Sequence, residues 1–159
     1  MYPHRLDDLR ARLANAGFDA GVFTDDDTVY YLTGFYDYLH MDFGRPTILV
    51  VPRHGHSLLI TPSIELEMAQ ATAHVDKIMA WNDGLGEEWR ETLPDVLSGI
   101  GQIAIEQLQM PPPVRSYLET LVGGEKLADV TAITADMRMI KTSEELQMAR
   151  HAGQVAMAM

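Results

Sequence analysis

The sequence contains no cysteine, and this absence removes several kinds of chemistry at once. A thiol nucleophile, a disulfide framework and a thiolate metal site all require that side chain. Lysine and arginine are also scarce, because 12 of them stand against 23 aspartates and glutamates, which gives a formal net charge of −11. Phosphate binding needs clustered cations, so we expect no nucleic-acid partner.

Long apolar runs are missing as well. The longest, at residues 48–51 and 58–60, have the length of a buried strand and fall far short of a membrane span. Residues 1–5 lack the apolar core of a secretory signal. We therefore expect a cytoplasmic protein with no membrane partner.

The chain does contain enough apolar side chains for one folded domain, at 47% of 159 residues. Apolar residues at helical spacing predict a helix over 3–16, and short apolar runs predict strands over 20–24, 47–51 and 57–61. The last two strands are close enough in sequence to form an antiparallel hairpin. Helical and strand-like segments then alternate. This pattern predicts the α/β class, as a three-layer α/β/α domain around a mixed, largely parallel sheet.

The C-terminal segment has a clear helix start and no helix stop. Residues 142–145 read T-S-E-E and fit a capping box. One helical face then carries Met148, Ala152, Val155 and Met159. Such an apolar stripe needs a cover. The helix either leads into a further domain or is a natural C-terminal helix that packs back on its own domain. The residues alone support the two alternatives about equally.

For most motifs that suggest chemistry, a purely structural role is the better explanation. The acidic triplet at 25–27 predicts a helix N-terminus rather than a metal site. His54 and His56 lie in the expected hairpin turn and do not complete a metal site alone. Gly84-Leu85-Gly86 follows a strand, but the third glycine of a dinucleotide loop would fall at Trp89. We predict no catalytic residue, no metal site and no cofactor in this chain.

One motif is left, Phe43-Gly44-Arg45, at the end of an aromatic-rich loop over 35–44. A guanidinium matches a carboxylate in two parallel hydrogen bonds, the phenylalanine offers an apolar wall, and the glycine lets a ligand approach the backbone. From these three residues alone, a surface arginine beside a capping phenylalanine is the better-supported explanation.

Three stretches of the chain resemble a known family. Residues 5–20 follow the pattern R-L-x-x-L-R-x-x-L-x-x-A-G-F-D-A, and residues 29–35 read V-Y-Y-L-T-G-F. Residues 138–146 read R-M-I-K-T-S-E-E-L, similar to a junction of the form R-x-I-K-S-x-E-E-I. The chain thereby resembles the N-terminal domain of the creatinase, prolidase and aminopeptidase P family. Thr28 and Ala104 stand where the family usually has asparagine and glycine.

The resemblance implies a ribonuclease-H-like fold over residues 1–141. Residues 142–159 would then be the first helix leading to a missing C-terminal "pita-bread" catalytic domain. It also implies that this fragment is inactive, whereas the full-length parent hydrolyses C–N bonds as an Xaa-Pro dipeptidase, an aminopeptidase or a creatinase-like enzyme. A peptidase parent would bind divalent metal (Mn, Co or Zn) through residues of that C-terminal domain, as the metallopeptidases of the family do.

The expected partners follow from the same resemblance. They are the chain's own catalytic domain, a second copy in a homodimer, and a small peptide or a small amidino or amino-acid substrate. Dimerisation would bring this domain to the substrate-site mouth of the neighbouring subunit. The F-G-R of creatinases contacts substrate, which implies substrate binding by Phe43 and Arg45. The alternative hypothesis is a free-standing small-ligand or protein-interaction α/β module, suggested by the aromatic loop and the acidic surface.

Overall fold

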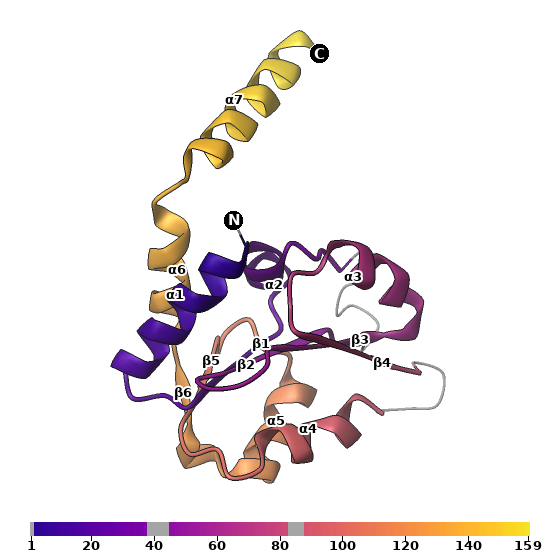
Figure 1. The fold of residues 1–159 in the computed structure, drawn as a ribbon, viewed down its shortest axis with the longest axis vertical. Coiled ribbons are helices and arrows are strands. Elements are labelled where there is room, and N and C mark those ends of the chain that lie inside the picture. The colour runs from indigo at the N-terminus through magenta and orange to yellow at the C-terminus, as the bar shows by residue number, and fades with distance from the viewer. Residues whose placement is uncertain (1, 38–44, 83–87) are drawn as a thin grey trace.

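The computed structural model describes residues 2–37, 45–82 and 88–159 of the chain. Its helices and strands surround a single sheet (Figure 1). In chain order the elements are α1 (Tyr2–Asn15), β1 (Ala20–Phe23), α2 (Asp26–Thr33), β2 (Ile48–Pro52), β3 (Leu58–Pro62), η2 (Ser63–Glu65), α3 (Leu66–Thr72), β4 (Lys77–Trp81), α4 (Trp89–Leu97), β5 (Ile103–Ile105), α5 (Pro112–Val122), η3 (Gly124–Lys126), β6 (Leu127–Asp129), α6 (Thr131–Met139) and α7 (Ser143–Ala158).

The sheet has six strands in the order β4-β3-β2-β1-β5-β6. β2 runs antiparallel to both of its neighbours, β1 and β3. The other pairs, β3 with β4, β1 with β5 and β5 with β6, are parallel. The expected hairpin and the mixed, largely parallel sheet are therefore confirmed. One edge of the sheet collects the carboxyl ends of the five strands that point the same way, together with the start of β2.

Each central strand supplies side chains to two apolar cores, one on each face of the sheet. In β2, Leu49 and Val51 belong to one core, whereas Ile48 and Val50 belong to the other. Successive side chains of a strand point to opposite faces, so a strand covered on both sides is apolar throughout. This explains why the sequence of β2 is a continuous apolar run rather than an alternating one.

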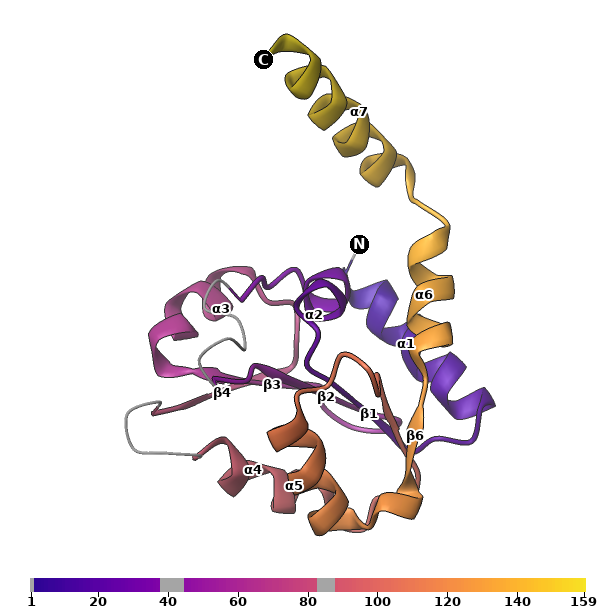
Figure 2. The same cartoon turned by 180° about the vertical axis from the view of Figure 1, so that it is seen from behind.

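Helices cover both faces and complete the three layers. α1, α2, α3 and α6 contribute to the core that contains Leu49, and α4 and α5 to the core that contains Ile48, as Figures 1 and 2 show from opposite sides. α1 buries Leu6, Leu9 and Leu13, which are spaced three and four residues apart. The α/β fold class predicted from the sequence is confirmed.

An internal proline lies in α4, and the neighbouring helix compensates for it. Pro94 has no amide hydrogen, so the carbonyl of Arg90, four residues earlier, receives no helical hydrogen bond from it. The hydroxyl of Tyr117, on α5, donates to that carbonyl at 2.9 Å. α4 therefore continues through Pro94 to Leu97.

The helix starts predicted from local signals are present. The Asp25 carboxylate accepts a hydrogen bond from the Thr28 amide at 2.9 Å and caps α2, so the acidic triplet does begin a helix. At the start of α7 the capping box is formed. Thr142 Oγ1 accepts from the Glu145 amide at 3.2 Å, and Glu145 Oε2 accepts from the Thr142 amide at 2.7 Å.

α7 leaves the rest of the molecule. In both views it extends beyond α6, away from the sheet and from the helices that cover it (Figures 1 and 2). Every residue of α7 is described, and none of them is buried. Its apolar stripe at Met148, Ala152, Val155 and Met159 is exposed. Among the described helices, none has both the length and the apolar character needed to cross a membrane.

Candidate functional site

The sequence-predicted substrate residues fall at the start of β2. Phe43 lies outside the described residues. Arg45 is half-buried and comes just before Pro46, whose carbonyl accepts a hydrogen bond at 3.3 Å from the indole of Trp81 at the end of β4. Arg45 therefore lies at the edge of the sheet where the parallel strands end. Ligands of open α/β sheets bind at this kind of edge.

A buried polar group, which we call the Asp37 cluster, supports the segment that follows Arg45. It comprises Asp37, Thr47, Thr61 and Glu65. The Thr47 hydroxyl donates to Asp37 Oδ2 at 2.6 Å and lies 3.1 Å from the Thr61 hydroxyl of β3. Through the Thr47 side chain, these hydrogen bonds anchor the segment that follows Arg45.

Glu65 brings a second carboxyl group to this cluster. Burial raises the pKa of Glu65, and the negative charge of Asp37 raises it further. Two carboxylates that share a poorly solvated place resist being ionised together. Glu65 consequently keeps its proton to a higher pH than an exposed glutamate does.

A second polar cluster lies at the ends of β1 and β5. Glu106, which follows β5, accepts at Oε1 from the hydroxyls of Thr28 (3.0 Å) and Thr134 (2.5 Å). Glu106 Oε2 and the Thr24 hydroxyl are buried without a hydrogen-bond partner among the described residues. Burial raises the pKa of Glu106 in spite of the two hydroxyl donors. With only 4% of its surface exposed, Glu106 cannot meet a substrate, and we assign it to joining α2 and α6 to the sheet.

The other motifs singled out in the sequence form no site among the described residues. His54 and His56 are exposed in the turn between β2 and β3. In residues 2–37, 45–82 and 88–159, no three His, Asp or Glu side chains gather as metal ligands would. Gly84-Leu85-Gly86 lies outside the described residues. Trp89, where a dinucleotide loop would need its third glycine, is buried at the start of α4.

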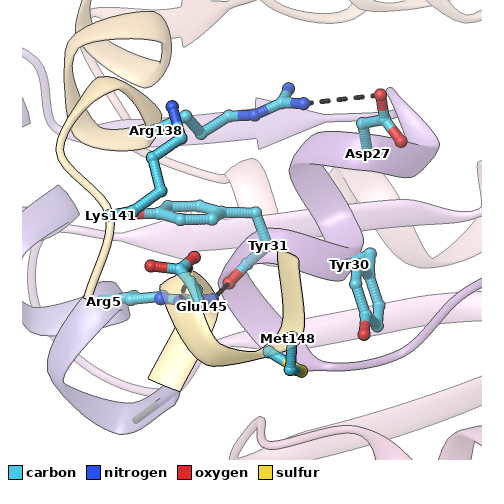
Figure 3. A pocket seen from close by; sticks show the side chains of 8 residues that line it. All are labelled: Arg5, Asp27, Tyr30, Tyr31, Arg138, Lys141, Glu145 and Met148. Atoms are coloured by element: carbon cyan, nitrogen blue, oxygen red, sulfur yellow. Dashed lines mark hydrogen bonds and ion pairs between the residues drawn. The ribbon is translucent and has the colours of Figure 1, made fainter. Parts of the chain in front are cut away.

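A pocket of about 300 Å³ lies where α6 passes into α7 (Figure 3). Arg5, Tyr31, Arg138 and Glu145 are among its lining residues, and they come from α1, α2, α6 and α7. Arg5 pairs with Glu145 at 2.7 Å, although 140 positions separate them in sequence. We call this hollow the junction pocket.

Sequence reasoning missed both the Asp37 cluster and the contact between Arg5 and Glu145. A signal for the contact was present, since Arg5 opens the first family-like stretch and Glu145 lies in the last. For the Asp37 cluster there was no comparable signal. Its threonines and carboxyls come from separate segments that only the tertiary fold brings together.

Comparison with known proteins agrees with this architecture. The family model described as the creatinase/prolidase N-terminal domain matches residues 5–140. The creatinase of Bacillus sp. (strain B-0618) is 24% identical over 152 residues, which make up 93% of this chain and 36% of the creatinase. This chain therefore spans about a third of the length of that curated relative.

Solved structures show the same fold. The creatinase/prolidase N-terminal domain of an X-Pro dipeptidase from Streptococcus pyogenes is 24% identical and aligns over 80% of this chain and 99% of its own, with a TM-score of 0.68. The Xaa-Pro dipeptidase from Bacillus anthracis is 19% identical and aligns over 99% of this chain and 41% of its own, with a TM-score of 0.81.

The fold and its neighbours define an α/β domain that is also found as part of a longer chain, since the match covers 41% of the Xaa-Pro dipeptidase from Bacillus anthracis. The family match runs from α1 to the end of α6 and covers most of the sequence. The chain belongs to the creatinase/prolidase N-terminal domain family.

Proposed function

We propose that this chain is the non-catalytic N-terminal domain of a creatinase/prolidase-family hydrolase. Residues 1–141 form the domain, and residues 142–159 form the first helix toward a C-terminal catalytic domain. The observation that carries the proposal is the division at α7. The family match stops at residue 140, and α7 then extends from the body with no buried residue and an exposed apolar stripe.

The chemistry of the parent is C–N bond hydrolysis, on an Xaa-Pro peptide or on a creatinase-like substrate. The names of the creatinase and Xaa-Pro dipeptidase relatives support this class. If the parent is a peptidase, its divalent metal is bound by the catalytic domain, because the described residues offer no converging ligand set. Two-metal sites in such enzymes activate water and polarise the scissile carbonyl.

Within this proposal the domain contributes to substrate binding through Arg45 and Phe43. It acts at the mouth of the active site of a neighbouring subunit in a cytoplasmic homodimer. The position of Arg45 at the sheet edge, on a segment fixed by the Asp37 cluster, supports a recognition role. A guanidinium at this place is suited to a carboxylate, because its planar fork matches the two oxygens in parallel hydrogen bonds.

The test compares this chain with a longer one that continues past residue 159 through the whole downstream reading frame. Both are assayed on Xaa-Pro dipeptides and on creatine, with and without added manganese. We expect turnover by the longer protein and none by residues 1–159. Clear metal-dependent hydrolysis by residues 1–159 alone contradicts the proposal, as does a stop codon directly after residue 159, which would favour a free-standing module.

A further inference from the structure

An ion pair joins the first turn of α7 to the body of the domain. Arg5 Nη2, from α1, donates to Glu145 Oε1 at 2.7 Å, and the two side chains are 10% and 21% exposed. Since no residue of α7 is buried, apolar packing does not hold the helix in its direction. A contact near its base therefore has a large influence on where its far end lies.

Arg5 is held in place before it reaches α7. Its Nη1 donates to the carbonyl of Tyr31 at 2.7 Å, and its guanidinium lies 4.1 Å from the centroid of the Tyr31 ring. The Tyr31 hydroxyl in turn donates to the carbonyl of Met137, on α6, at 2.8 Å. Arg5 and Tyr31 thus connect α1, α2 and α6 into one support, and Figure 3 shows the Arg5 side chain reaching from it to Glu145.

Glu145 uses its two oxygens for two tasks. Oε2 accepts from the Thr142 amide at 2.7 Å and closes the capping box, whereas Oε1 accepts from Arg5. Partial burial opposes ionisation, but hydrogen bonding from Thr142 and the charge of Arg5 hold the pKa of Glu145 below its ordinary value. The carboxylate that begins α7 is therefore also the group that anchors it.

The preceding helix is braced separately. Arg138, on α6, lies 3.4 Å from Asp27 and 3.9 Å from Asp25 at the start of α2. The buried Met137 and the hydrogen bond from Thr134 to Glu106 hold α6 on the body, so the joint is the short stretch between α6 and α7. The junction pocket beside it, about 300 Å³, leaves space into which α7 can tilt once its anchor is lost.

We propose that Arg5 and Glu145 form a clamp that sets the direction of α7 relative to the sheet. What α7 leads into rests on the proposed function, under which the clamp positions the catalytic domain relative to the edge that carries Arg45. The clamp itself consists only of residues of this chain and does not depend on the proposed function. Arg5 and Glu145 are positioning residues and touch no reacting atom.

The absence of cysteine makes the direction of α7 directly measurable. Gln70→Cys on α3 and Gln154→Cys on α7, both exposed, carry a pair of spin labels, and pulsed electron resonance gives the distance distribution between them. The test variant is Glu145→Gln, because glutamine at this position still closes a capping box and removes only the charge. Arg5→Gln removes the other partner. Glu119→Gln, which breaks the exposed Arg115 pair on α5, is the matched control.

The doubly labelled protein with Arg5 and Glu145 unchanged is expected to give a single narrow distribution of label-to-label distances. Glu145→Gln and Arg5→Gln widen it about twofold or more. The melting temperature of Glu145→Gln changes by no more than about 2 °C, because a partly exposed pair contributes little to global stability. Arg5→Gln also loses the hydrogen bond to the Tyr31 carbonyl and is expected to melt at a lower temperature. Glu119→Gln leaves the distribution as it was. A distribution that is already broad in the parent chain, or equally narrow in Glu145→Gln, overturns the clamp.

A kinetic measurement in the longer protein tests what the clamp positions. Glu145→Gln is expected to lower kcat/KM about tenfold at unchanged melting temperature, since small misplacements of a reacting group are costly, and Glu119→Gln to leave it unchanged. A wider distance distribution in Glu145→Gln together with an unchanged kcat/KM overturns the positioning role. If the longer protein hydrolyses nothing, the proposed function fails, and the distance measurement alone decides on the clamp.

Discussion

Arg45 places a half-buried positive charge at the sheet edge where the parallel strands end. In the longer protein we expect Arg45→Ala to raise KM for substrates that bear a carboxylate by roughly 10- to 100-fold, with a smaller effect on kcat. Losing a charge-assisted hydrogen bond costs about 1.5–3 kcal/mol, and about 1.4 kcal/mol is a factor of ten. Steady-state kinetics on matched substrates with and without the carboxylate measure the effect.

Two further variants separate this role from a loss of fold or of general charge. Arg45→Lys keeps the charge without the planar fork and is expected to recover only part of the affinity. Arg53→Ala removes an exposed arginine from the turn after β2 and is expected to leave KM unchanged. Equal KM values for Arg45→Ala and the parent on every carboxylate substrate would return Arg45 to a structural role.

Glu106 is a buried carboxyl whose pKa lies above its ordinary value of 4.5. A raised pKa means that the folded state binds the proton more tightly than the unfolded state. The stabilisation from this group is therefore fully present below the unfolded pKa and is lost as the pH rises through the folded pKa. Glu106→Gln, which cannot ionise, is expected to gain free energy of unfolding relative to the parent across that window, by about 1.4 kcal/mol for each unit of pKa shift.

Urea unfolding at a series of pH values measures that difference. The same substitution at Glu67, an exposed residue of α3, removes no buried carboxyl and controls for the general effect of losing one acid. Glu106→Ala leaves the Thr28 hydroxyl without its acceptor and is expected to cost about 1–3 kcal/mol. A free-energy difference between Glu106→Gln and the parent that stays constant with pH would contradict the account of Glu106.

Among the helices, α4 and α5 depend on each other through the hydroxyl of Tyr117. We expect Tyr117→Phe to lower the free energy of unfolding by about 1 kcal/mol, because the Arg90 carbonyl then loses its donor. In a Pro94→Ala background the restored amide can serve that carbonyl, so the same substitution is expected to cost less. Tyr30→Phe, at an exposed tyrosine of α2, is the control, and equal costs in both backgrounds would exclude the compensation.

Elements with local signals were predictable, and contacts between distant segments were not. The starts of α2 and α7 follow from Asp25 and Thr142, whose side chains bond to amides three residues away. β4 begins at Lys77. Just before it, Asp76 Oδ2 accepts from the amide and hydroxyl of Ser57. That partner lies 19 positions earlier, beyond any local pattern.

At the scale of the whole molecule, the alternation of helices and strands was enough to predict three layers around a mixed sheet. Composition and spacing could not supply the Asp37 cluster, because the pairing of β2 with β3 brings Thr47 beside Thr61, and the tertiary fold brings Asp37 to Thr47. Arg5 and Glu145 could be suspected only from a family-like pattern at each end of the chain. A long-range polar contact has no periodicity, so it becomes visible when the topology is known.

The division between the body and α7 leads to a prediction about the whole chain. Ending the chain at residue 141 is expected to change the free energy of unfolding by less than about 1 kcal/mol, because α7 buries nothing and the lost Arg5–Glu145 pair is partly exposed. Ending it at residue 130 also removes α6, whose Met137 belongs to the core, and is expected to cost about 2–5 kcal/mol.

Urea unfolding of the two shortened chains, beside residues 1–159, makes the comparison. If α7 proves to add no stability to the body, its complete capping box and exposed apolar face support the proposal that another part of the full-length protein covers it. If the chain ending at 141 lost as much stability as the chain ending at 130, α7 would instead be packed on the body in solution. The boundary at residue 141 would then have to be abandoned.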